Sequence, residues 1–165
     1  MRIATWNVNS IKAHMEQALR WLKEANPDVV CLQEIKCEEH GFPAMTFEEL
    51  GYKSVVLGQK TWNGVAILSK LPMEDVVRGL PGEATDEQAR YIQATVFEDG
   101  RPCTIGCIYL PNGNPPSTDK YPYKLRWMER LIAHTRSLLK FEEPVVLAGD
   151  YNVIPEDKDT YSVKA

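Results

Sequence analysis

The sequence predicts a single mixed α/β domain with more strands than helices. The chain has 165 residues, close to the size of one ordinary domain. With 44% hydrophobic and 25% charged residues, its composition excludes a disordered or fibrous protein. Short apolar runs typical of strands alternate with two longer stretches of helical periodicity. This pattern indicates a core built on β-sheets, with helices covering at least one sheet face.

The first element is an expected strand over residues 2–8, and a helix follows it. The apolar positions on one face of this helix are Ile11, Met15, Ala18, Leu19 and Leu22. Ser10 is its expected N-cap, and Asn26-Pro27 is expected to end it. The next run, 28–32, is continuously apolar after its first residue, as in a strand that is buried on both faces.

The remaining elements continue the alternation. A short helical piece is expected at 47–50, and strands are expected at 52–57, 64–69, 73–80, 91–97 and 103–110. Residues 98–101 read as a tight hairpin turn, and the proline-rich stretch 111–116 as a loop. A long helix is expected over 119–140, and its predicted apolar stripe is Leu125, Met128, Leu131, Ile132, Leu138 and Leu139. A last buried strand, 144–148, delivers residues 149–152 to its C-terminal end.

The charge balance limits the classes of partner. The formal net charge is −4, which argues against binding to nucleic acid or membrane through bulk positive charge. Residues 120–140, however, contain six Lys or Arg and a single Glu. This stretch is either a solvated helix face or a local surface that attracts phosphate groups.

Cysteine spacing and hydropathy indicate a reduced, cytoplasmic protein. The four cysteines form no C-x-x-C pair, so reduced, structural thiols are expected rather than a zinc site. No apolar run of about 20 residues occurs, and the N-terminal segment is polar, so neither a membrane span nor a secretory leader is expected. The motifs of serine hydrolases, P-loop proteins and zinc proteases are absent from the sequence.

Polar residues interrupt the apolar pattern at four predicted strand ends. They are Asn7 with Asn9, Glu34, Tyr109 with Asn112, and Asp150 with Asn152. Ligand sites of α/β proteins gather at such ends, and oxygen ligands of this kind suit Mg²⁺ or Mn²⁺. One carboxylate could hold a metal while a second handles a nucleophilic water, which suggests metal-assisted phosphoester hydrolysis. Each residue taken alone also has an ordinary explanation in turn formation, capping or solvation.

At these residues the sequence is similar to the exonuclease III family of AP endonucleases, within the endonuclease/exonuclease/phosphatase superfamily. The matching stretches are TWNVNSI (5–11), LQEIK (32–36), WNGVAILSK (62–70), QARYI (88–92), IYLPNG (108–113), YKLRWMERL (123–131) and GDYNVIPEDKD (149–159). LQEIK and GDYNV indicate the superfamily. WNGVAILSK and IYLPNG point to its DNA-repair branch rather than to phosphoinositide phosphatases.

The resemblance implies a four-layered α/β sandwich, in which two packed β-sheets are flanked by helices. It also implies Mg²⁺-dependent hydrolysis of DNA phosphodiesters, with Mn²⁺ as a possible substitute. The implied partner is double-stranded DNA with abasic sites or 3′ ends, bound by a monomer without a membrane or an obligate protein partner. The implied reactions are incision 5′ to abasic sites, 3′→5′ exonuclease action and trimming of 3′ ends.

The resemblance also assigns roles to individual residues. Glu34 and Asn7 match the metal site, and Asp150 matches the residue that activates the attacking water. Tyr109 and Asn152 match the groups that contact the scissile phosphate. As substrate-binding residues, Asn112 matches a DNA contact, and Lys36 an electrostatic neighbour of the metal-binding carboxylate.

One departure from the family pattern bears on activity. Members of the family continue well past the GDYN motif, to an Asp-containing motif and a Ser-Asp-His motif. The 165 residues are therefore expected to be the N-terminal portion of one such domain, with the second sheet short of strands and an apolar face exposed. Two alternatives remain open: a phospholipid or phosphoinositide phosphoesterase of the same superfamily, and an inactive fragment or nucleic-acid-binding module.

Overall fold

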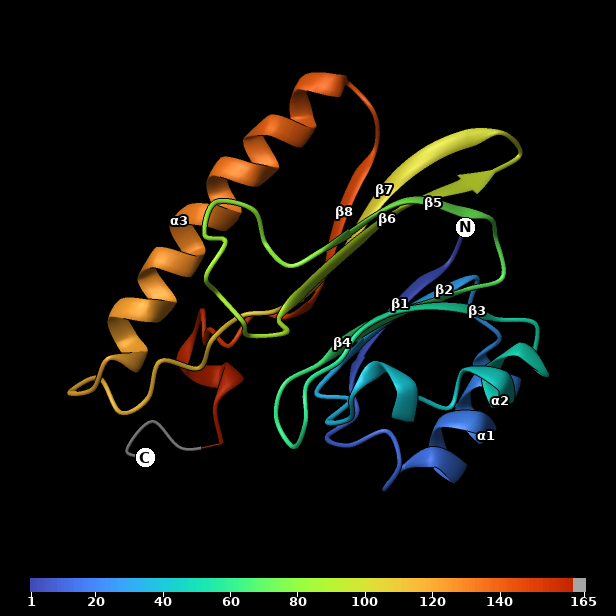
Figure 1. Ribbon diagram of the computed structural model, residues 1–165, viewed down its shortest axis with the longest axis horizontal. Coiled ribbons are helices and arrows are strands. Elements are labelled where there is room, and N and C mark those ends of the chain that lie inside the picture. Colours follow the sequence, from blue (N-terminus) through green and yellow to red (C-terminus); the bar gives the residue numbers. More distant parts are fainter. Residues whose placement is uncertain (162–165) are drawn as a thin grey trace.

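The computed structural model describes residues 1–161, in which two four-stranded β-sheets pack face to face (Figure 1). The first sheet, in the order β1-β2-β4-β3, consists of β1 (Ile3–Asn7), β2 (Val29–Gln33), β4 (Val65–Ser69) and β3 (Lys53–Leu57). The second, in the order β5-β6-β7-β8, consists of β5 (Met73–Arg78), β6 (Tyr91–Glu98), β7 (Arg101–Tyr109) and β8 (Val145–Asp150).

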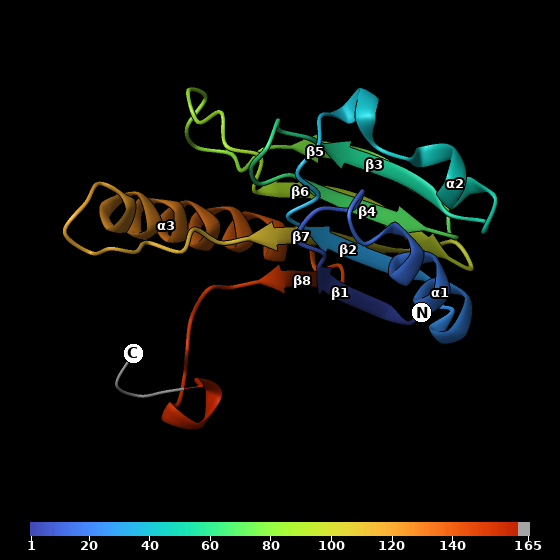
Figure 2. The ribbon, with the colours of Figure 1, turned by 90° about the horizontal axis from the view of Figure 1, so that it is seen from below.

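Helices cover the outer face of each sheet. The first sheet carries α1 (Met15–Ala25) and α2 (Ala44–Glu48), and the second carries α3 (Lys120–Leu138), as Figure 1 shows. Figure 2 looks onto the sheets from below, with β1 and β8 along the same edge. Short 3₁₀ helices lie at Glu39–Gly41, Leu139–Phe141 and Asp157–Asp159. The expected four-layered α/β sandwich is therefore confirmed.

The apolar runs of the sequence reflect strands that are buried on both faces. In β2, Val29 and Cys31 face the core between the two sheets, whereas Val30 and Leu32 face the core beneath α1 and α2. Side chains alternate between the two faces of a strand, so a strand between two cores must be apolar at every position. The same reasoning explains the predicted run in β4, where all five residues are buried.

Two parallel strand pairs bring their carboxyl ends to the same end of the molecule. In the first sheet β1 runs parallel to β2, and Asn7 lies opposite Gln33. In the second sheet β7 runs parallel to β8, and Tyr109 lies opposite Asp150. Because β1 also packs next to β8, these four strand ends meet where the two sheets face each other. This meeting point positions the site described below.

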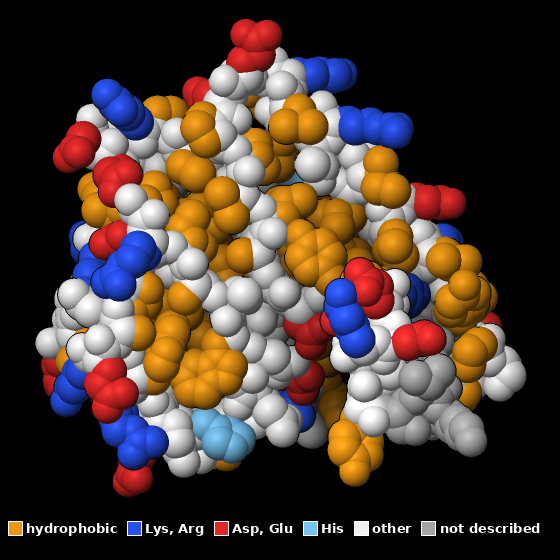
Figure 3. Space-filling view, turned by 180° about the vertical axis from the view of Figure 1, so that it is seen from behind, with side chains coloured by type: hydrophobic (Ala, Val, Ile, Leu, Met, Phe, Trp, Pro, Cys, Tyr) orange, Lys and Arg blue, Asp and Glu red, His pale blue; other side chains and the backbone are white. Residues whose placement is uncertain are grey.

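The strands β1 and β8 are the edges of their sheets on one side of the sandwich, and every residue of β8 is half-buried. Figure 3 shows this side, where hydrophobic side chains gather on both halves of the molecule. Among the exposed apolar residues are Val153 and Ile154, directly after the strand that ends at Asp150. The expected exposure of apolar surface is thus observed, although each sheet has four strands in the described part of the chain.

The first helix begins later than the sequence indicates. Residues 11–14 form a turn, and α1 starts at Met15 with His14 as its N-cap. Ser10 is therefore not the helix N-cap: its φ of 84° places it in a turn, and its carbonyl oxygen accepts a hydrogen bond from the His14 amide at 3.2 Å. The short helix is also displaced, lying at residues 44–48 rather than 47–50.

The predicted apolar stripe of the long helix is partly wrong. Trp127, Leu131 and Leu138 are buried in α3, and Met128 packs beside them. The other predicted members are substantially exposed: Leu125 (43%), Ile132 (49%) and Leu139 (59%). At 3.6 residues per turn these three lie on a different face from Trp127, and the sheet covers the face that carries the tryptophan. Periodicity alone could not choose between the two faces.

The cysteines agree with the sequence analysis. Cys31, Cys37, Cys103 and Cys107 are all free and buried. Across residues 1–161, no helix has the length and apolar character needed to cross a membrane.

Candidate active site

Asn7 joins two carboxylates that come from different sheets. Its Nδ2 donates hydrogen bonds to Oε1 of Glu34 at 2.8 Å and to Oδ2 of Asp150 at 2.9 Å. The two acceptor oxygens can therefore be no farther apart than the sum of these distances, so both carboxylates border the same small volume. The Oδ1 of Asn7 accepts a hydrogen bond from the backbone amide of Asn9 at 3.1 Å, which fixes the orientation of the side-chain amide.

The backbone around Glu34 is held by the turn that precedes β4. The amides of Ile35 and Lys36 donate to the carbonyls of Gly64 and Asn63, at 3.2 and 3.0 Å. Gly64 has a φ of 87°, and a Cβ there would lie 2.5 Å from the side chain of Ile35. Glycine is thus required for this close approach, which explains the Asn-Gly pair within the WNGVAILSK stretch.

Glu34 is held in its ionised form. Burial would raise the pKa of its carboxyl group, but hydrogen bonds from Asn7, Lys36 and Tyr109 outweigh burial and lower the pKa below its usual value. The Tyr109 hydroxyl donates to Oε1 at 2.9 Å, and the Lys36 ammonium lies 3.1 Å from Oε2. Lys36 also donates to the side-chain oxygen of Asn9. A negative charge is therefore present at this position at neutral pH.

Tyr109 is a neutral hydrogen-bond donor. Burial, followed by the hydrogen bond to Glu34 and the charge of that carboxylate, raises the pKa of Tyr109 to about 12. The phenol therefore stays protonated at neutral pH. Its hydroxyl donates a hydrogen bond to Glu34 and could donate one to a phosphate oxygen instead.

A network of polar contacts orders the segment that follows β8. The Asn152 amide donates to Oδ1 of Asp150 at 3.0 Å, and the side chain of Asn152 donates to the carbonyl of Leu110 at 2.7 Å. Asn112 reaches Oδ1 of Asn152 at a longer 3.4 Å. Asn112, Asp150 and Asn152 line a cavity of about 750 Å³ that extends over Gly149–Ile154 and the start of α3. The structure thus brings Asn7, Glu34, Tyr109 and Asp150 into direct contact, and Asn112 and Asn152 line the adjoining cavity.

Two residues at this site did not stand out in the sequence. Lys124 of α3 donates to the backbone carbonyls of Asn152 at 2.6 Å and Asn112 at 3.3 Å. Arg90 lies with its guanidinium carbon 4.7 Å from the ring centroid of Tyr109. Arg90 lies in the QARYI stretch and Lys124 in the YKLRWMERL stretch, both of which resemble the family. This resemblance was the only feature of the sequence that could have identified them. A charged side chain by itself indicates an exposed position.

The donor atoms fit a hard divalent cation. Within residues 1–161, no group of three or more His, Cys, Asp and Glu is arranged to hold a metal ion. Mg²⁺, however, commonly takes one or two carboxylates and fills its remaining positions with water and phosphate oxygens. The ionised Glu34 and the neighbouring Asp150 carboxylate supply oxygen donors of this type. Asn7 turns its amide nitrogen toward them and its amide oxygen toward the backbone amide of Asn9.

A two-sheet sandwich with paired carboxylates at its strand ends is typical of metal-dependent phosphoesterases. A sequence profile of the Endonuclease/Exonuclease/phosphatase family matches residues 4–165, and the chain belongs to this family. Exodeoxyribonuclease III of Haemophilus influenzae is 31% identical over 96% of the chain and 60% of its own length. An exodeoxyribonuclease of Bacillus subtilis is 30% identical over the whole chain and 64% of its own length.

Comparison with solved structures also finds an AP endonuclease and a 3′ phosphatase. An AP endonuclease from Archaeoglobus fulgidus is 41% identical with a TM-score of 0.87, and the match covers 98% of this chain and 61% of the other. The 3′ phosphatase NExo from Neisseria, solved with a product DNA hairpin, is 37% identical with a TM-score of 0.90, over 99% of this chain and 62% of the other. The chain thus spans about three-fifths of the length of these relatives.

Proposed function

We propose that this chain belongs to a Mg²⁺-dependent DNA-repair phosphodiesterase of the exonuclease III and AP endonuclease type. The observation that carries the proposal is the shared Asn7 amide, which holds Glu34 and Asp150 side by side across the two sheets. The proposed reactions are incision 5′ to abasic sites, 3′→5′ exonuclease action on duplex DNA and trimming of 3′ ends. The similarity to exodeoxyribonucleases and to an AP endonuclease supports this choice.

In the proposed mechanism Glu34 would hold the metal ion, and Asn7 would join it through its amide oxygen once the side-chain amide turns over, with Mn²⁺ able to replace Mg²⁺. When bound, the ion neutralises charge on the scissile phosphate. Asp150 orients the attacking water and accepts its proton. Tyr109 and Asn152 donate hydrogen bonds to phosphate oxygens, where negative charge grows in the transition state. Lys36 keeps Glu34 ionised, consistent with the lowered pKa of that carboxyl group.

Duplex DNA is the proposed substrate, bound by a cytoplasmic monomer. A relative was solved with a DNA hairpin, which supports a nucleic acid rather than a lipid substrate. The loop residue Asn112 and the nearby Lys124 line the cavity beside Asp150, where they can contact the DNA backbone. Local contacts of this kind, together with the metal ion, offset the acidic net charge of the chain.

A nicking assay tests the proposal. The substrate is a duplex with a single abasic-site analogue, incubated with Mg²⁺ or with EDTA, and inositol phosphates serve as the competing substrate class. Both the 165-residue chain and the complete gene product are assayed, and we expect cleavage of the DNA by the complete product. Glu34→Gln and Asp150→Asn should abolish cleavage with little loss of folding, whereas Glu16→Gln, at an exposed position on α1, should retain it. Near-normal turnover by Asp150→Asn, or a preference for inositol phosphates, would contradict the assignment.

A further inference from the structure

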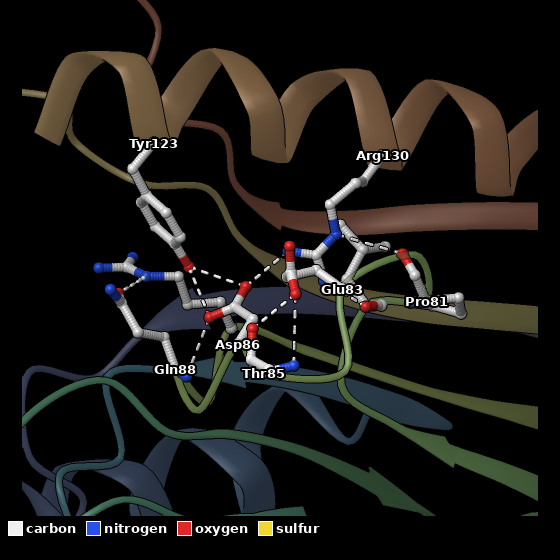
Figure 4. A network of polar contacts seen from close by, with 9 residues as sticks. Pro81, Glu83, Thr85, Asp86, Gln88, Tyr123 and Arg130 are labelled. Atoms are coloured by element: carbon white, nitrogen blue, oxygen red, sulfur yellow. Dashed lines mark hydrogen bonds and ion pairs between the residues drawn. The ribbon is translucent and has the colours of Figure 1, made fainter. Parts of the chain in front are cut away.

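The segment that connects β5 to β6 is fastened to α3 by one buried carboxylate. The side chain of Asp86 is 7% exposed and forms an ion pair with Arg130 at 2.6 Å. It also accepts hydrogen bonds from the Tyr123 hydroxyl at 3.0 and 3.1 Å, as Figure 4 shows. Arg130 donates in addition to the carbonyls of Pro81 and Leu80. These contacts fix the segment against the helix, because a buried ion pair with its hydrogen bonds satisfied is costly to open.

Hydrogen bonds connect Asp86 through Gln88 to Arg90. Oδ1 of Asp86 accepts a hydrogen bond from the Gln88 amide at 3.1 Å. The Gln88 side-chain oxygen in turn accepts a hydrogen bond from Nε of Arg90 at 2.7 Å. The direction in which the guanidinium group extends is therefore set by contacts that begin at α3.

Arg90 holds Tyr109 from two sides. Its guanidinium group stacks on the ring at 4.7 Å from the centroid, and its Nη1 donates to the carbonyl of Tyr109 at 3.3 Å. The backbones are also joined, because the Tyr109 amide donates to the Arg90 carbonyl at 2.8 Å. With ring and backbone both held, the hydroxyl is left pointing at Glu34, 2.9 Å away.

We infer that Arg90 is a positioning residue, which acts by holding the Tyr109 hydroxyl at the reacting phosphate, and that the Asp86–Arg130 pair supports it from α3. This inference rests on the proposed function, in which Tyr109 donates to the phosphate. It assigns Arg90 no contact with DNA. Loss of Arg90 should therefore slow the reaction without weakening substrate binding, and the loss should depend on the presence of the Tyr109 hydroxyl.

The kinetic test uses Arg90→Gln in the complete gene product, with Arg101→Gln as the matched control. Arg101 is an exposed arginine at the opposite end of the same strand β7, about 26 Å along the strand from Tyr109. We expect Arg90→Gln to lower kcat about tenfold with KM within about twofold, and Arg101→Gln to change neither. In a Tyr109→Phe background, Arg90→Gln should cause no further loss. A raised KM with unchanged kcat, or the same tenfold loss in the Tyr109→Phe background, would overturn the inference.

A second measurement does not depend on nuclease activity. 3-Fluorotyrosine placed at position 109 reports the environment of the ring by ¹⁹F NMR. Arg90→Gln should move this resonance toward that of free fluorotyrosine, Asp86→Asn should move it in the same direction by a smaller amount, and Arg101→Gln should leave it in place. An unmoved resonance in Arg90→Gln would overturn the positioning role. A shifted resonance in a protein without nuclease activity would instead show that the proposed function is wrong while Arg90 still positions the ring.

Discussion

The side-chain nitrogen of Asn7 lies 2.9 Å from Oδ2 of Asp150, although 143 positions separate the two residues in the sequence. One residue ends the first strand of the first sheet, and the other ends the last strand of the second sheet. The contact therefore exists only when the two sheets are packed against each other. For this reason the candidate active site is a property of the assembled sandwich and of neither sheet alone.

Asn7→Asp should make the stability of the fold depend on a divalent cation. The substitution replaces the donor between Glu34 and Asp150 with a third negative charge, and we expect the free energy of unfolding to fall by about 1–3 kcal/mol without metal. Mg²⁺ should restore most of this loss, because a third carboxylate adds a ligand of the type that the ion prefers. Thermal denaturation with EDTA and with Mg²⁺ measures both effects.

Asn9→Asp is the matched control for that experiment. Its new carboxylate would face the Lys36 ammonium, which already donates to the Asn9 side chain, so no loss of stability is expected. If Asn7→Asp were as stable as the wild type in EDTA, the amide of Asn7 would not be holding two charged carboxylates together.

Gly149→Ala should displace Asp150. A Cβ at position 149 would collide with the backbone carbonyl of Ile108 on the neighbouring strand β7. The strand would have to shift, and we expect a loss of about 2–4 kcal/mol in the free energy of unfolding together with loss of cleavage. Urea denaturation and the nicking assay provide the two measurements.

The comparison for Gly149 is Gly100→Ala in the β6–β7 turn. Gly100 has a φ of 75° but open space around it, so alanine should cost about 1 kcal/mol there and leave cleavage unchanged. Equal losses at both positions would mean that backbone strain, and not the close approach of two strands, determines the effect at Gly149.

The positions of the strands and the end of the sheets that carries the site could be predicted, because both depend on residues that are close together in the sequence. Apolar runs bounded by turn residues identified each strand within residues 1–161, and the Asp99-Gly100 turn lies where the sequence placed a hairpin. Polar residues at the predicted strand ends indicated which end of the sheets carries the chemistry. That Asn7 would be the residue joining Glu34 to Asp150 could not be predicted, because it depends on how two sheets face each other.

Other features depended on contacts between segments that are distant in the sequence. The helix α3 has apolar residues on two faces, and the choice of Trp127 over Leu125 as a buried residue depends on the sheet beneath the helix. Arg90 and Lys124 carry charges that predict solvent exposure, yet each has most of its polar contacts inside the fold. Side-chain partners of this kind have no signature in sequence periodicity.

Lys124→Met should loosen the segment after β8 while preserving the helix. The ammonium group donates to the carbonyls of Asn152 and Asn112, and methionine keeps an apolar stem of similar length without a donor. We expect the free energy of unfolding to fall by about 1–2 kcal/mol and limited proteolysis near residues 151–154 to become faster. Lys120→Met, at an exposed position where α3 begins, should alter neither measurement. Faster proteolysis in Lys120→Met as well would assign the effect to the lost positive charge rather than to the two carbonyl contacts.

His134 should make the fold less stable as the pH falls below about 6.5. Burial lowers the pKa of this histidine from 6.5, and its Nε2 lies 2.8 Å from the side-chain oxygen of Gln93 and 3.1 Å from the Tyr91 hydroxyl. Because the folded pKa lies below the unfolded value, the unfolded chain binds more protons between the two values. Stability is therefore fully present above the unfolded pKa and decreases as the pH falls toward the folded one.

Urea denaturation at several values between about pH 7.5 and 5.5 should show a smaller decrease of stability in His134→Gln than in the wild type. His40→Gln, at an exposed position, serves as the control. If His134→Gln and the wild type lost stability in parallel over this range, the acid sensitivity would have to come from other groups.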